Sequence, residues 1–242
     1  MNRFRVTVTA ALALSAAVAW DTHRARHSGS VEDDPARPNV LLIGDSIRIG
    51  YAPPTRTLLA GEADVFWPDV NCHATVDGLA GLEGWLGDRA WDVVHFNFGL
   101  HDLKHLDAQG QFAAPPVGRP VVGVDDYAAN LEQLVDRLAA TGATLVWATT
   151  TPVPEGALGR VRGDEVRYNA AALEVMVRHG VRVDDLHAFV APRAGELQKP
   201  ADVHFTDTGS RALAREVAAS VRAALADRAA ARGPSPGALG PW

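Results

Sequence analysis

The sequence has few of the residues on which several classes of protein depend. Its single cysteine among 242 residues excludes an intramolecular disulfide and any metal site built from several cysteines. Its 23 basic residues are outnumbered by 29 acidic ones, and the net charge of −6 gives no electrostatic footprint for nucleic acid. The glycine-rich phosphate motifs G-x-G-x-x-G and G-x-x-x-x-G-K-[ST] are also absent.

The chain nevertheless has enough apolar sequence for a packed core. Residues of the AVILMFWYC set make up 47% of it, which excludes wholesale disorder. A length of 242 residues fits one α/β domain.

The first 19 residues have the layout of a secretory signal peptide. Arg3 and Arg5 precede an apolar run at 6–18, which is too short to span a bilayer comfortably, and Ala-Val-Ala at 17–19 is a small-x-small cleavage site. We expect export, to the medium or the periplasm, without stable membrane association after cleavage. A buried N-terminal helix or an uncleaved anchor is the alternative.

The remaining sequence divides into a domain and two flanking segments. Residues 20–37 lack apolar periodicity and are expected to form a flexible lead-in, whereas 231–242, rich in Gly and Pro, are expected to form a disordered tail. The domain then occupies residues 38–230.

Strand and helix patterns alternate through this domain. Short apolar runs predict strands at 39–43, 63–67, 91–98, 144–149 and 181–184, and helical patterns lie at 47–60, 79–89, 125–141, 163–179 and 207–230. The alternation, with nearly continuous apolar strands, predicts an α/β fold: a parallel sheet of about five strands with helices on both faces. A functional site is then expected at the carboxyl ends of the strands.

Polar residues follow two of these strands and precede the last helix. Gly-Asp-Ser-Ile at 44–47 follows the first strand, so Ser46 could expose its hydroxyl while its N–H forms part of an oxyanion hole, or it could simply cap the helix. Gly-Leu-His-Asp at 99–102 follows the third strand, and Asp-Val-His-Phe-Thr stands at 202–206. A base in this last segment could face Ser46, as a serine nucleophile requires.

These three blocks, in their order and spacing, resemble those of the SGNH (GDSL-type) hydrolases over roughly residues 38–227. The resemblance implies a three-layer α/β/α sandwich of flavodoxin-like fold and ester hydrolysis without a cofactor. It also implies that Ser46 is the nucleophile and His204 the general base.

The third block departs from the family pattern G-x-N-D, because His101 stands where an asparagine would donate to the oxyanion. A neutral imidazole can donate one N–H, but it would bring a titration near pH ~6.5. Alternatively, His101 only packs or bonds to Asp102.

The last block departs from the pattern D-x-x-H, because Ala201 stands three residues before His204. Asp202 is the nearest acid, and it would orient His204 if this segment is extended. A backbone carbonyl or a Ser–His dyad are the alternatives. A literal D-x-x-H occurs at 184–187, but no Phe-Thr-Asp-x-Gly helix start follows it, so His204 is preferred to His187.

The loop after the second strand lacks the oxyanion-hole glycine of the family. The N–H of Cys72 is the first candidate donor and that of Gly78 the second. Cys72 could equally be a small buried apolar residue.

Two further side-chain groups admit both functional and ordinary interpretations. Five histidines, some beside Asp102 or Asp202, suggest a metal site but lack the H-E-x-x-H spacing, and scattered histidines are the preferred interpretation; they are His73, His95, His101, His105 and His204. Arg48 and Lys104 could attract an anionic acyl or sugar group, or be solvated surface charges.

The sequence therefore predicts an exported serine esterase acting on a small-molecule or carbohydrate ester. A small acyl group such as acetyl is preferred, because no long apolar lid segment is seen. The alternatives are acyl transfer by the same serine, a catalytically silent binding module, and a metal-dependent hydrolase.

Overall fold

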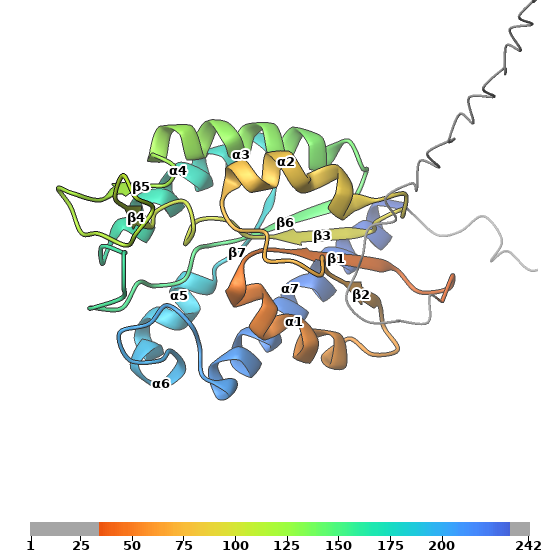
Figure 1. The fold of residues 1–242 in the computed structure, drawn as a ribbon. Helices are drawn as coiled ribbons and strands as arrows, with labels where there is room; N and C mark the ends of the chain where they lie inside the picture. The colour runs from red at the N-terminus through yellow and green to blue at the C-terminus, as the bar shows by residue number, and fades with distance from the viewer. Residues whose placement is uncertain (1–33, 233–242) are drawn as a thin grey trace, which may run out of the picture.

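A parallel five-stranded sheet forms the centre of the computed structural model, which describes residues 34–232 (Figure 1). The strand order is β2-β1-β3-β6-β7, the flavodoxin-like order once the strands are counted within this sheet. The strands are β1 (Asn39–Ile43), β2 (Asp64–Phe66), β3 (Val93–Phe96), β6 (Thr144–Ala148) and β7 (Arg182–Asp184). The core strands β1 and β3 are almost wholly buried, as expected for a parallel sheet covered on both faces.

Helices cover both faces of the sheet (Figure 1). One face carries α2 (Thr75–Leu86), α3 (Val124–Ala139) and α4 (Asp164–His179), and the other carries α1 (Ser46–Leu58), α5 (Leu186–Val190), α6 (Ala194–Leu197) and α7 (Asp207–Arg232). The helix predicted at 125–141 is present as α3, and its apolar residues at three- and four-residue steps are entirely buried; they are Tyr127, Leu131, Leu134, Val135 and Leu138. The predicted three-layer α/β/α sandwich with about five parallel strands is confirmed.

Two details differ from the sequence expectations. A small antiparallel pair, β4 (His105–Leu106) with β5 (Arg119–Pro120), lies outside the main sheet. Its two-residue strands are too short to leave a periodic pattern. The second helix begins at Thr75 rather than near residue 79, because the Asp77 carboxylate accepts the Ala74 N–H at 3.0 Å and supports an earlier helix start.

The ends of the chain lie mostly outside the described residues. These exclude the predicted signal peptide at 1–19, most of the predicted lead-in and residues 233–242. Residues 34–37 of the lead-in form a turn held to β2, where Asp64 accepts the Asp34 N–H at 2.8 Å and pairs with Arg37 at 3.0 Å. Within 34–232, no helix is long and apolar enough to cross a membrane.

The strand order determines where a site can form. The chain leaves β1 toward β2 on one side and later enters β3 on the other side, so β1 and β3 flank the point at which the topology reverses. Crevices at such points, beyond the carboxyl ends of the strands, are the usual ligand sites of open α/β sheets. Residues 44–46 follow β1, and residues 99–102 lie just beyond the end of β3.

Candidate active site

Asp45, and not Ser46, caps helix α1. The Asp45 carboxylate accepts the Ile47 N–H at 2.9 Å, which leaves Ser46 as the first helical residue with its hydroxyl free for another partner. Burial raises the pKa of Asp45, although the hydrogen bond from Ile47 and the charge of Arg48 oppose this. Gly44 allows the tight strand-to-helix connection, since a Cβ there would lie 2.9 Å from the Arg48 Cβ.

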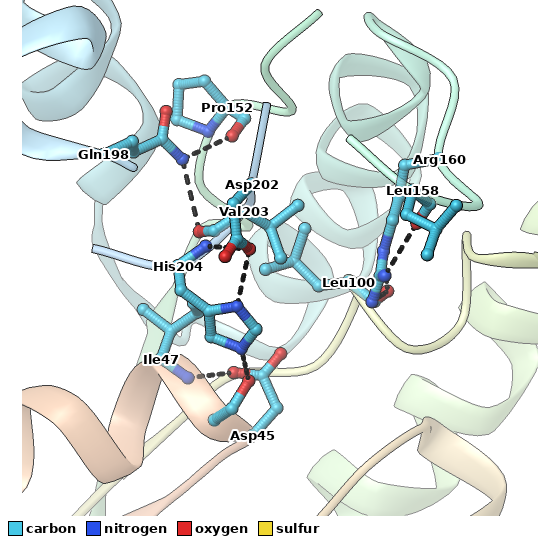
Figure 2. Close-up of polar contacts among 11 residues, drawn as sticks. Asp45, Ile47, Leu100, Pro152, Leu158, Arg160, Gln198, Asp202, Val203 and His204 are labelled. Carbon is cyan, nitrogen blue, oxygen red and sulfur yellow. Dashed lines mark hydrogen bonds and ion pairs between the residues drawn. The ribbon is translucent and has the colours of Figure 1, made fainter. Parts of the chain in front are cut away.

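A hydrogen-bonded chain links Ser46, His204 and Asp202. The Ser46 Oγ lies 2.9 Å from the His204 Nε2, and the His204 Nδ1 lies 2.7 Å from the Asp202 Oδ1. Figure 2 shows the His204 ring between Asp202 and the start of α1. Because the carboxylate accepts from Nδ1, the Nε2 is free to accept from the serine hydroxyl. This is the geometry of a nucleophile, a base and an orienting acid.

The segment that carries the acid is a turn and not the extended segment that the sequence analysis required. Ala201 has φ +51°, and the Asp202 carboxylate accepts the His204 backbone N–H at 3.1 Å as well as the ring Nδ1. Asp202 thus folds back over its own turn and reaches the histidine two residues later. Gln198 supports the turn by donating to the Val203 carbonyl at 3.4 Å and the Pro152 carbonyl at 2.8 Å (Figure 2).

The charges in this chain suit a base rather than a buried ion pair. The side chains of His204 and Asp202 are 44% and 41% exposed. Burial alone would raise the pKa of Asp202, but the backbone and ring hydrogen bonds from His204 lower it below its ordinary value. Asp202 is therefore a carboxylate at neutral pH and accepts the Nδ1 proton of His204.

His101 is held as a neutral donor. Its Nδ1 lies 3.4 Å from the Lys104 ammonium, which can only donate, so this nitrogen accepts and the ring proton is on Nε2. The His73 Nδ1, 3.3 Å from the same nitrogen, must then donate to it. Burial, followed by the charges of Lys104 and His73, lowers the pKa of His101 to about 3. The titration expected near pH 6.5 is therefore wrong for the folded protein.

The Asp102 carboxylate does not bond to His101, which was one alternative. Its Oδ1 accepts the Thr75 N–H at 2.8 Å and the Thr75 hydroxyl at 2.6 Å, and Asn130 donates to that hydroxyl at 3.0 Å. Burial raises the pKa of Asp102 to about 7 despite these bonds. Asp102 thus joins the loop after β3 to the start of α2.

Neither predicted loop donor has a free N–H. The Cys72 N–H donates to the Gly44 carbonyl at 3.2 Å, and the Gly78 N–H donates to the Ala74 carbonyl at 3.0 Å inside α2. The prediction that the Cys72 N–H contributes to an oxyanion hole is therefore wrong in this geometry, and its side chain is buried with the Sγ accepting from Arg48 at 3.8 Å. Gly78 has a packing role, since a Cβ there would lie 2.8 Å from the Phe98 ring.

Arg48 is a structural residue and not a solvated charge. Its side chain is only 1% exposed, and it donates to the carbonyls of Gly44 at 3.2 Å, Pro68 at 3.3 Å and Val70 at 2.5 Å. It thereby fastens the loop after β2 to the end of β1. Lys104, by contrast, is half-buried beside His101.

Two of the other histidines have their hydrogen-bond partners outside the Ser46–His204–Asp202 chain. His95 is buried within the fold and bonds to Asp184 at 3.0 Å. His187, the alternative base, lies on α5 with its ring 3.7 Å from Glu165, and its backbone N–H donates to Thr149. No group of three or more metal-binding side chains is found among residues 34–232.

Sequence reasoning missed Arg160, which reaches the site from the loop after β6. Its guanidinium donates twice to the Leu100 carbonyl, at 3.3 and 3.1 Å, and once to the Leu158 carbonyl at 3.1 Å (Figure 2). The residue lies in no recognisable motif, so only the folded loop brings it beside the block at 99–102.

Comparison with known proteins agrees with this geometry. Residues 42–212 match the GDSL-like lipase/acylhydrolase family. No curated protein matches the sequence.

Several solved structures share the fold. A lipase/acylhydrolase from Enterococcus faecalis is 20% identical with a TM-score of 0.64, covering 77% of this chain and 96% of its own. The acetylxylan esterase Axe2 from Geobacillus stearothermophilus is 18% identical with a TM-score of 0.60, covering 76% and 94%. A putative SGNH hydrolase from Slackia heliotrinireducens is 22% identical with a TM-score of 0.56, covering 76% and 99%.

Proposed function

The chain belongs to the GDSL-like lipase/acylhydrolase family, and from this premise we propose that it hydrolyses carboxylic esters with Ser46 as the nucleophile. The observation that carries the proposal is the hydrogen-bonded chain from Ser46 through His204 to Asp202, with its distances of 2.9 and 2.7 Å. A serine hydroxyl is a weak nucleophile at neutral pH unless a base of this kind removes its proton.

The reaction follows from the roles of these atoms. The Ser46 Oγ attacks the ester carbonyl while the His204 Nε2 takes the hydroxyl proton, which then passes to the leaving alcohol. Water, activated by the same histidine, hydrolyses the acyl-enzyme. Asp202 keeps the other ring proton on Nδ1 and stabilises the imidazolium that forms at each step.

Two donors are proposed for the oxyanion. The Ser46 N–H lies in the first turn of α1, where N–H groups have no partner within the helix and the helix dipole favours negative charge. The second donor is the Nε2–H of His101, whose low pKa keeps it neutral and whose tautomer is fixed by Lys104. The Cys72 N–H is not a third donor, because it donates to the Gly44 carbonyl.

A small acyl group, such as acetyl on a carbohydrate or another small ester, is the proposed substrate. The half-exposed His204 and Asp202 suit a small acyl group attached to a larger alcohol that remains in solvent. Proteins of the same fold include the acetylxylan esterase Axe2. We also propose export of the enzyme, on the signal-like layout of residues 1–19, which N-terminal sequencing of the extracellular or periplasmic protein would test.

Hydrolysis of 4-nitrophenyl acetate tests the proposal, with Ser46→Ala, His204→Ala and the matched control His187→Ala. We expect the first two variants to lose at least ~10³-fold in kcat, whereas His187→Ala keeps the wild-type rate. Activity that Ser46→Ala retains, or that a chelator removes from the wild type, would contradict the proposal. A wild type that releases 4-nitrophenol only when a sugar acceptor is added, with the acetyl group passing to that sugar, would instead indicate acyl transfer.

A further inference from the structure

Two cationic side chains beside the site have no acidic partner. Among the described residues, neither Arg160 nor Lys104 has a carboxylate within ion-pair distance. The Arg160 guanidinium donates only to the carbonyls of Leu100 and Leu158, and the Lys104 ammonium contacts only the His101 Nδ1. Both side chains are half-buried, and a half-buried cation without an ion-pair partner is available to an anionic ligand.

The acids closest to Arg160 are already engaged elsewhere. Asp45 and Asp202 are the carboxylates whose charges reach it, but the first accepts from the Ile47 N–H and the second from His204. The charges of Lys104 and Arg160 also act on each other and on His101, since they lower the pKa values of Lys104 and His101 after burial does. Asp77 and Asp102 oppose this effect at Lys104, but Asp77 accepts the Ala74 N–H and Asp102 accepts from Thr75, and neither carboxylate pairs with the ammonium.

The Arg160 side chain is positioned before any ligand arrives. The Gly159 carbonyl accepts the His105 N–H at 2.7 Å, which docks the loop onto the β4–β5 hairpin, and the guanidinium lies 5.6 Å from the Phe112 ring. Three of its five N–H groups are used by carbonyls, so two remain for an anion. A guanidinium group held in this way loses little further conformational entropy when it binds a carboxylate.

We propose that Arg160 and Lys104 form a cationic subsite that binds a carboxylate of the ester substrate, so that the enzyme prefers anionic esters to neutral ones. Figure 2 places Arg160 beside Leu100, on the flank of the site that holds His204. The inference rests on the proposed function, because it assigns a substrate class to the same serine site. The carboxylate belongs either to the acyl part or to the alcohol part of the ester.

Two matched pairs of esters distinguish a carboxylate on the acyl part from one on the alcohol part. One pair is 4-acetoxybenzoate and its methyl ester, with the charge on the alcohol part. The other is 4-nitrophenyl hemisuccinate and its methyl ester, with the charge on the acyl part. The measured quantity is the ratio of kcat/KM for the anionic ester to that for the neutral one, divided by the same ratio for hydroxide hydrolysis.

In the wild type we expect a ratio of about ten or more for one pair at low salt, the size of one charge-assisted hydrogen bond, falling toward one in ~0.5 M NaCl. Arg160→Gln and Lys104→Gln should each lower the ratio several-fold, and Arg160→Lys should restore part of it. Arg162→Gln is the matched control, because this exposed arginine of the same loop pairs with Glu155 at 3.8 Å. It should leave the ratio unchanged.

A wild-type ratio near one for both pairs would overturn the inference, as would a preference that Arg160→Gln and Lys104→Gln both leave intact. If Arg160→Gln does not fold, Lys104→Gln and the salt series decide. Neutral esters hydrolysed with Ser46 dependence but without an anion preference would refute only this inference. If no ester of either charge is hydrolysed, the proposed function itself fails.

Discussion

Replacing His101 by asparagine tests whether this histidine is a neutral donor. In the folded protein its pKa is lowered from 6.5 to about 3, chiefly by burial, whereas the unfolded chain restores the ordinary value. Between these two pH values the unfolded state binds a proton that the folded state does not. The free energy of unfolding of the wild type must therefore fall as the pH falls below 6.5.

The size of this effect follows from the pKa difference. A pH of 5 lies about 1.5 units below the pKa of the unfolded imidazole, and at about 1.36 kcal/mol per unit the free energy of unfolding falls by roughly 2 kcal/mol. The His101 side chain is only half-buried, so solvent screening reduces the expected effect to about 1–2 kcal/mol. His101→Asn lacks this contribution and keeps an amide that can donate.

Urea unfolding of wild type and His101→Asn at pH 7.5 and pH 5 measures the difference directly. The wild type should lose about 1–2 kcal/mol more than the variant over this interval, and groups common to both proteins cancel. The ratio of their kcat values should stay constant with pH, while His101→Ala should lose on the order of 10²-fold in kcat. If the free energy of unfolding changes equally with pH in both proteins, or if the kcat ratio titrates near pH ~6.5, His101 is not a neutral donor in the folded protein.

Three other substitutions test the surrounding geometry. Asp202→Asn should lower kcat on the order of 10³-fold with little change in KM, because the amide no longer holds the His204 tautomer; a loss below about threefold would indicate a Ser–His dyad. Arg48→Met should reduce the free energy of unfolding in urea by about 1–3 kcal/mol, because the Pro68 carbonyl loses its donor while the Gly44 carbonyl keeps the Cys72 N–H, and no measurable change would contradict the structural role of Arg48. Asp102→Asn should raise the free energy of unfolding at pH 8 but not at pH 4. Burial raises the Asp102 pKa to about 7, so above that pH the wild-type folded state holds a buried carboxylate, which destabilises it and which the variant lacks. A gain in the free energy of unfolding that is the same at both pH values would contradict this.

The fold could be predicted because its signals are local. The central strands β1, β3 and β6 are mainly apolar runs of a few residues, and the buried residues of α3 repeat at helical spacing. The β4–β5 pair has no such signal, because its two-residue strands are held by the loops around them. The same holds for the start of α2, which depends on a side-chain hydrogen bond.

The sequence predicts those site residues whose place depends only on the order of strands and helices. The roles of Ser46 and His204 could be predicted because Ser46 follows the first strand and His204 precedes the last helix. The reach of Asp202 depends on a turn with positive φ at Ala201, which no pattern indicated. The occupied N–H of Cys72 and the arrival of Arg160 depend on contacts between loops distant in sequence, so only the folded structure reveals them.

Covalent labelling with a fluorophosphonate tests whether Ser46 is an activated nucleophile, because such a reagent phosphonylates only a serine that a nearby base has activated. We expect the wild type to gain the mass of one phosphonyl group, which peptide mapping places on Ser46, and Ser46→Ala to gain none. His204→Ala should label far more slowly, and His187→Ala at the wild-type rate. Labelling of another residue, or equal labelling of Ser46→Ala, would contradict the assignment of Ser46 as the nucleophile.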